Sequence, residues 1–170
     1  MGLYFIANGP MPTTAAQATV ATGTAIKTML QLKPFNVLKI IEWGCHFTVP
    51  AAIATMRCEL LDTGTVFGTV TASADADVTK LGSVEDAVAS VAGLTLGTSA
   101  TGYTCTSEGS ITAVRMFDLA IFTPSTLNGG GFYKQFPLGR EPKGIIGNAI
   151  RIRVTADVTA NCYSYMVVEI

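Results

Sequence analysis

Few side chains in this sequence are of the kinds that perform chemistry, and their spacing argues against a catalytic site. His46 is the only histidine, so an acid–base mechanism that uses imidazole would depend on it alone. Glu42 stands four residues earlier and could orient it, but four residues along a strand span about 13 Å, too far for a hydrogen bond. We therefore expect no catalytic residue, and we do not expect an enzyme.

The cysteines lack the spacing of a zinc site or a redox motif, because no two of them form a Cys-x-x-Cys pair. They are Cys45, Cys58, Cys105 and Cys162. A hairpin centred between Ala51 and Ala52 would set Cys45 opposite Cys58, where a disulfide could form. The alternative is that both are small buried apolar residues, the usual state of a free cysteine. We expect no bound metal ion and no cofactor.

Two further motifs are incomplete. Asp75 and Asp77 could offer carboxylates to calcium, but the glycine and the closing glutamate of an EF-hand loop are missing, so a solvated loop is favoured. The glycines at 129–131 are not followed by Lys-Ser, Lys-Thr or a helical pattern. They indicate a flexible turn rather than a phosphate-binding loop.

The composition is apolar and poor in charge. Of the 170 residues, 49% are hydrophobic and only 14% are charged, against about a quarter charged in an average protein. With 11 Lys and Arg and 12 Asp and Glu, the net charge is -1, which attracts neither nucleic acid nor an anionic membrane. No apolar run approaches the roughly 20 residues of a spanning helix, and the short apolar run at the start lacks the basic residues of an export signal. We expect the chain to bury part of its surface against copies of itself.

Strands must position these side chains, because Thr, Val and Ile are abundant and apolar residues alternate with polar ones. In the segment 149–155, Ile150, Ile152 and Val154 face inward. Arg151 and Arg153 then lie side by side on the outer face, in solvent or in an interface. Strands are expected near residues 3–7, 25–33, 36–48, 53–62, 66–72, 94–97, 102–106, 110–123, 132–137, 149–156 and 161–169.

This pattern predicts an all-β fold, an antiparallel two-sheet sandwich of the jelly-roll type, since no alternation of helices and strands appears. One short helix is expected near 83–92, where Ser83 can cap it. Residues 1–23 are expected to form an N-terminal strand and an extended arm, and residues 24–170 the sandwich domain. The stretch 8–24 is uncharged and rich in small residues, so it fits either an ordered edge strand with a loop or an arm laid across a neighbouring subunit.

Two sets of residues are candidates for an interface between subunits. The strand at 3–6 can add to a sheet edge, in its own subunit or in a neighbour, and the loop 137–144 places Arg140 next to Glu141, where an ion pair could anchor the loop or join two subunits. The candidate interface residues are Leu3, Tyr4, Phe5, Ile6, Arg140, Glu141, Arg151 and Arg153.

Several short segments resemble small structural proteins encoded in the genomes of tailed bacteriophages. They are Gly-Thr-Ser-Ala-Thr-Gly-Tyr-Thr at 97–104, Glu-Gly-Ser-Ile-Thr-Ala-Val-Arg at 108–115, Pro-Leu-Gly-Arg-Glu-Pro at 137–142, Arg-Ile-Arg-Val-Thr-Ala at 151–156, Ile-Glu-Trp-Gly at 41–44 and Cys-Glu-Leu-Leu at 58–61. The resemblance implies a virion component, such as a capsid decoration or cement protein, made in the cytoplasm of a bacterial host. It brings no binding residues with it.

Two functions from different classes are therefore carried forward. The first is a non-enzymatic structural protein of a virus particle that self-associates, with a trimer as the first guess, and binds the major capsid protein of the outer shell. The alternative is a carbohydrate-binding β-sandwich module or fibre-tip domain, in which Trp43, Tyr103 or Tyr133 would stack on sugar rings. No nucleic-acid or membrane partner is expected in either case.

Overall fold

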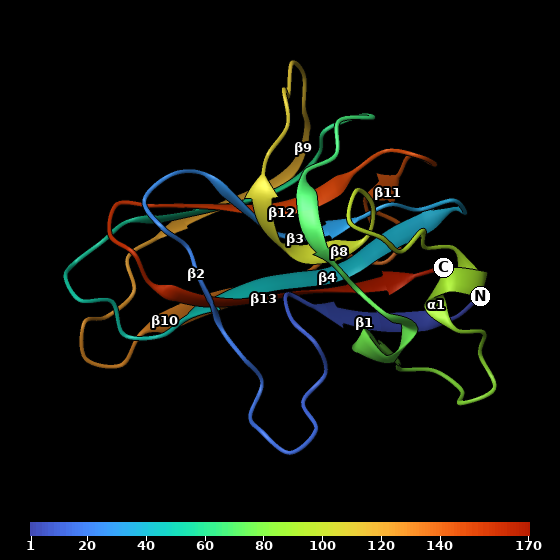
Figure 1. Cartoon of the computed structure of the whole chain (residues 1–170), viewed down its shortest axis with the longest axis horizontal. Helices are drawn as coiled ribbons and strands as arrows, with labels where there is room; N and C mark the ends of the chain where they lie inside the picture. The colour runs from blue at the N-terminus through green and yellow to red at the C-terminus, as the bar shows by residue number, and fades with distance from the viewer.

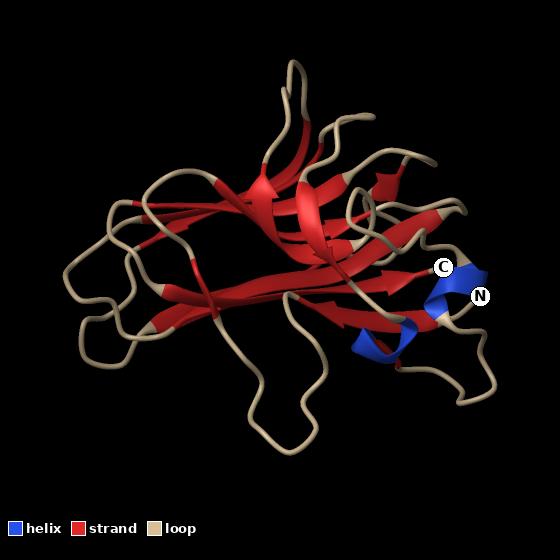
Figure 2. Cartoon of the chain, viewed as in Figure 1, coloured by secondary structure: helices blue, strands red, loops and turns tan.

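The strands of the chain form two antiparallel β-sheets that pack face to face (Figure 1, Figure 2). They are seen in a computed structural model that describes all 170 residues. The first sheet, here termed sheet A, runs in the order β10 (Gly130–Gln135), β4 (Leu38–Phe47), β13 (Asn161–Glu169), β1 (Leu3–Ala7) and β7 (Val78–Lys80), with β11 (Lys143–Gly144) on β4 and β2 (Val20–Ala21) on β13. The second, sheet B, runs β6 (Thr69–Ala72), β8 (Gly102–Ser107), β3 (Lys27–Leu32), β12 (Ile150–Ala156), β5 (Met56–Asp62) and β9 (Arg115–Phe122).

The strand order confirms the jelly roll. Eight strands make up its frame; in chain order they are β1, β3, β4, β5, β9, β10, β12 and β13. Sheet A then has the order first, eighth, third, sixth, and sheet B has the order second, seventh, fourth, fifth. This is the double Greek-key winding of a jelly roll, in which successive strands repeatedly change sheet.

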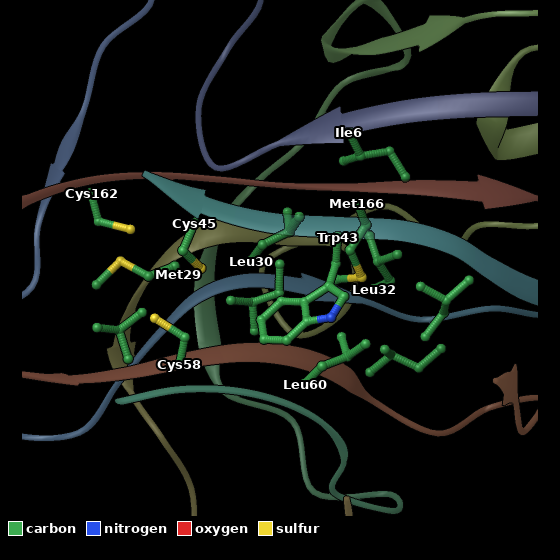
Figure 3. Close-up of a cluster of buried hydrophobic side chains, with 14 of the residues drawn as sticks. Ile6, Met29, Leu30, Leu32, Trp43, Cys45, Cys58, Leu60, Cys162 and Met166 are labelled. Atoms are coloured by element: carbon green, nitrogen blue, oxygen red, sulfur yellow. The ribbon is translucent and has the colours of Figure 1, made fainter. Parts of the chain in front are cut away.

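One core lies between the sheets, as Figure 3 shows for its central side chains. Strand alternation builds it: along β13, Cys162, Ser164, Met166 and Val168 are buried, while the residues between them face outward. Trp43 of β4 lies in the middle of this layer and is fully buried. A single cluster of 26 buried residues from both sheets makes one core, so the chain is not divided into separate packing units.

The chain between β4 and β5 does not form the hairpin that would pair Cys45 with Cys58. It crosses from sheet A to sheet B, so that the two cysteines face each other across the core, close to Cys162 (Figure 3). All four cysteines are buried and free. Burial raises the pKa of the Cys45 thiol, and the neighbouring thiols of Cys162 and Cys58 raise it further. Cys45 and Cys58 are therefore small buried apolar residues and not partners in a disulfide.

The helix expected near 83–92 is confined to a single turn, α1 (Ala89–Ala92). Residues 83–88 form a turn instead, because the Ser83 hydroxyl accepts from the Glu85 amide and the Asp86 carboxylate accepts from the Ser83 amide. Such short polar side chains compete with helical hydrogen bonding. A 3-10 turn, η1 (Asp75–Asp77), precedes β7. The strand expected at 94–97 consists only of isolated bridges, Pro34 to Leu94 and Leu96 to Thr101.

The N-terminal segment is part of sheet A rather than an arm attached to a sandwich of residues 24–170. β1 lies between β13 and β7, with Tyr4 and Ile6 in the core. The chain leaves the sheet after Asn8 and returns to the same neighbour, β13, at Val20. Within residues 1–23, it is the intervening loop, residues 9–19, that projects from the sheet, as the blue loop at the bottom of Figure 1. None of the helices is long and apolar enough to span a membrane.

Candidate interaction surface

The outer face of sheet A, the side turned away from sheet B, gathers aromatic rings from four neighbouring strands. Strand alternation directs Phe5 of β1, Tyr163 and Tyr165 of β13, His46 of β4 and Tyr133 of β10 to this side. We term these five residues the aromatic face. Tyr133 is 68% exposed and His46 is also exposed, while the other three rings are half-buried against their neighbours.

Four of these rings contact one another around Tyr165. The ring centroids of Phe5 and Tyr165 lie 5.3 Å apart in a stacked arrangement. On the other side of Tyr165, the His46 ring lies parallel to it at 6.2 Å, with an interplanar angle of 4°. Tyr163 packs against Tyr165 at 6.2 Å. Aromatic pairs at these separations add stability beyond the area that they bury.

Two glycines make room for these rings. Gly44 of β4 stands opposite Tyr165 on one side and Tyr133 on the other. A Cβ atom at Gly44 would lie 2.8 Å from the Tyr165 ring, so the absence of a side chain lets this ring lie flat over β4. At Gly131 of β10, a Cβ atom would lie 2.5 Å from Nδ1 of His46. The imidazole therefore lies over β10 in the same way.

The charged groups of this side are already paired within the chain. The Tyr165 hydroxyl donates to Oε1 of Glu42 at 2.6 Å. Burial raises the pKa of Tyr165 well above its ordinary value, and the hydrogen bond to Glu42 raises it further. At the far end of the sheet, Nζ of Lys39 and Oε2 of Glu169 form an ion pair of 2.8 Å. Apart from the hydrogen-bonded carboxylate of Glu42, the central part of the face presents apolar rings and hydroxyl groups.

Of the four candidate interface residues on β1, only two face outward. Leu3 and Phe5 are half-buried on the outer side of sheet A. Tyr4 and Ile6 are core residues, and the Tyr4 hydroxyl donates to the carbonyl of Ala87 at 2.8 Å. These two cannot contact a partner while the fold is intact. Phe5 is the one member of this group that the structure brings into the aromatic face.

Arg151 does not lie in solvent beside Arg153. It is fully buried under the loop that follows β5, where its guanidinium donates to Oε2 of Glu108 at 3.1 Å and to the carbonyl of Val66 at 2.5 Å. Burial lowers the pKa of Arg151, and Glu108 opposes that shift. Arg153 is half-buried and pairs with Glu59 at 2.9 Å. Alternation predicts the outer side for both arginines, but it does not show that a loop covers one of them.

The loop 137–142 closes on itself. Oε1 of Glu141 accepts a hydrogen bond from the Gly139 amide at 3.0 Å, and such backbone hydrogen bonds lower the pKa of Glu141. Arg140 is exposed and makes no ion pair with Glu141. The ion pair suggested by their adjacency is absent within the chain, and these two residues lie apart from the aromatic face.

Trp43 takes part in a contact that sequence reasoning missed. Its Nε1 donates to Oδ2 of Asp118 at 2.9 Å, while the other oxygen of Asp118 forms an ion pair with Lys134 at 2.6 Å. These residues come from β4, β9 and β10, so the group joins the two sheets along one side of the molecule. Nothing in the spacing of the three residues along the chain indicates this contact.

Three hollows and two acidic side chains, Asp75 and Asp77, lie elsewhere on the surface. Three surface pockets have volumes of about 350, 270 and 260 Å³. The carboxylate of Asp75 is occupied by Ser90, whose amide donates to it at 2.8 Å, and Asp77 accepts from the amide of Ala74. No group of three or more His, Cys, Asp or Glu side chains could hold a metal ion. The aromatic face is therefore the surface with the most organised side chains.

Comparison with known proteins adds no family to this description. No protein-family model matches the chain, and no curated protein matches it. The fold and this surface define a jelly-roll protein with aromatic side chains gathered on the outer face of one sheet.

Proposed function

We propose that this protein is a non-enzymatic structural component of a virus particle, a capsid decoration or cement protein that self-associates and binds the major capsid protein of the outer shell. The observation that carries the proposal is the aromatic face. Contacting aromatic rings on the outer face of a sheet are the kind of side chain that is enriched in the cores of protein interfaces.

Two further features support self-association as the role of this face. Only 14% of the residues are charged, so the surface has few groups that would keep copies apart. The Glu42 carboxylate is hydrogen-bonded to Tyr165, and Lys39 is paired with Glu169, which lowers the cost of covering these charged groups with another copy. The jelly roll is a fold that viral capsid proteins use, which supports the virion assignment by analogy alone.

The carbohydrate-binding alternative has weaker support. Trp43, the ring best suited to stacking on a sugar, is fully buried and its Nε1 is bonded to Asp118. Tyr103 is half-buried on β8 of sheet B, while Tyr133 is exposed on sheet A, so the two do not share a platform.

Sedimentation velocity of the purified chain tests the proposal. We expect an oligomer at micromolar concentration, with a trimer as the first stoichiometry to fit. Tyr133→Asp places a charge in the aromatic face and should shift the protein to monomer, since an unpaired charge is costly to bury. Leu127→Asp is the matched control, because Leu127 is 83% exposed on the loop between β9 and β10. A wild-type monomer, or equal dissociation of both variants, contradicts the proposal.

The shell partner is tested separately. We expect a major shell protein to be encoded beside this chain, and particles assembled from that shell protein should co-sediment with wild-type protein. The absence of portal, protease and shell genes from its neighbourhood, or particles that fail to retain the protein, would count against a decoration role.

A further inference from the structure

The one histidine of the chain, His46, lies in the proposed interface. It is exposed on the aromatic face with its ring parallel to Tyr165. In register it lies between Tyr163 of β13 and Gly131 of β10. A second copy that covered the face would therefore cover the imidazole as well.

No carboxylate of the same chain forms a hydrogen bond or an ion pair with His46. On β4 itself the nearest acid is Glu42, about 13 Å along the strand, and it accepts from the Tyr165 hydroxyl. The titratable groups that face His46 from β13 are Tyr163 and Tyr165, and from β10 Tyr133, all phenols. Lys134, next on β10, is held by Asp118. β1 contributes Phe5, which carries no charge.

We propose that protonation of His46 releases the self-association made through the aromatic face. The inference rests on the proposed function, since it concerns the same surface and a second copy of this chain as its occupant. Imidazole is the side chain whose ordinary charge change falls between pH 5 and 8. A positive charge in an interface of rings without a nearby acid opposes assembly, and each copy adds one.

The sign of the effect follows from linkage. The assembled state favours neutral His46, so assembly is complete where the imidazole is neutral and is lost as the pH falls. For each proton taken up on dissociation, the association constant falls by up to tenfold per pH unit. Because the chain has one histidine, a dependence between pH 7.5 and 5.5 has one principal candidate group.

The experiment measures association by sedimentation velocity at pH 7.5 and pH 5.5 for wild type, His46→Gln and His46→Phe. Wild type should be an oligomer at pH 7.5 and should dissociate at pH 5.5. Both variants, which take no proton at this position, should associate equally at the two pH values. Glu85→Gln is the matched control: it removes an exposed carboxylate on the turn at 83–88, outside the aromatic face, and should keep the pH response of wild type.

The outcomes separate the two proposals. A wild-type monomer at pH 7.5 overturns the proposed function itself. A wild-type oligomer with the same association constant at both pH values overturns the role of His46, as does a pH response that persists in His46→Gln. If both His46 variants fail to associate, calorimetric dilution of wild type in two buffers of different ionisation enthalpy measures the proton uptake. About one proton per chain supports the proposal, and none overturns it.

Discussion

Residues at equivalent outward positions of the two sheets have different surroundings. Tyr165 and Arg151 both occupy outward positions of central strands. Tyr165 stays at the surface in contact with other rings, whereas Arg151 is enclosed by the loop at 63–68 and by Glu108. The same strand position therefore supports an interaction surface on sheet A and an internal polar contact on sheet B.

Arg151 should be more sensitive to substitution than Arg153. Arg151→Met leaves the Val66 carbonyl without its partner and the Glu108 carboxylate with Thr28 alone, so we expect the free energy of unfolding to fall by about 3 kcal/mol, as on breaking a buried ion pair. Arg153→Met removes a single ion pair with Glu59, in which each side chain is 13% exposed, and should cost about 1 to 2 kcal/mol. Urea denaturation of the two variants measures the difference, and equal losses would contradict this account of the loop.

Among the structural elements, β1 and the loop that follows it differ in role: β1 belongs to the core of the fold, whereas the loop 9–19 is mostly exposed. β1 contributes two core residues to sheet A, and the Asn8 side chain bridges to β13, where its Nδ2 donates to the Cys162 carbonyl and its Oδ1 accepts from the Ser164 amide. The loop 9–19 joins β1 to β2, and both of these strands pair with β13. Its residues between Pro10 and Thr19 are mostly exposed and uncharged. A loop of this kind can be removed without breaking the ladder on either side.

We expect replacement of residues 10–18 by Gly-Ser to change the melting temperature by only a few degrees, because the strand pairs on both sides remain. Association should weaken, because the loop begins beside the aromatic face: Ala7 pairs with Tyr165. Deletion of residues 1–7, in contrast, should abolish cooperative unfolding, since Tyr4 and Ile6 leave the core. Thermal melting and sedimentation velocity provide the two readouts. Unchanged association after loop replacement would remove the loop from the interface.

At the level of the whole molecule, one core joins both sheets without a covalent or metal crosslink. The four cysteines are free, and three of them, Cys45, Cys58 and Cys162, belong to the apolar core between the sheets. The stability of the fold then depends on burial and on the strand ladders.

Neither a chelator nor a reductant should destabilise the protein. We expect the melting temperature in EDTA and in dithiothreitol to equal that in buffer, because no disulfide closes a loop and no metal links the sheets. Differential scanning calorimetry measures both conditions. A decrease of several degrees in dithiothreitol would reveal a disulfide, and the same decrease in EDTA would reveal a structural metal.

The sequence alone determined the class of fold and most of the strands. Alternation is a local property, so Ile150, Ile152 and Val154 could be assigned to the core and the residues between them to the outer side. β1 and β13 were predicted with the bounds that the structure has, because each is a clear run of strand-forming residues. The jelly roll followed from the number of strands and the absence of alternating helices.

Which outer positions are covered, and which outer side chains meet, depends on contacts between segments that lie far apart in the chain. The turn after Cys45 could be a hairpin or a crossing between sheets, and only the packing of both sheets selects the crossing. Residues 83–88 have a helical pattern, but local side-chain hydrogen bonds hold them as a turn. The aromatic face joins Phe5, His46, Tyr133 and Tyr165 from distant parts of the chain. Strand order and register, which depend on contacts across the whole molecule, bring them together.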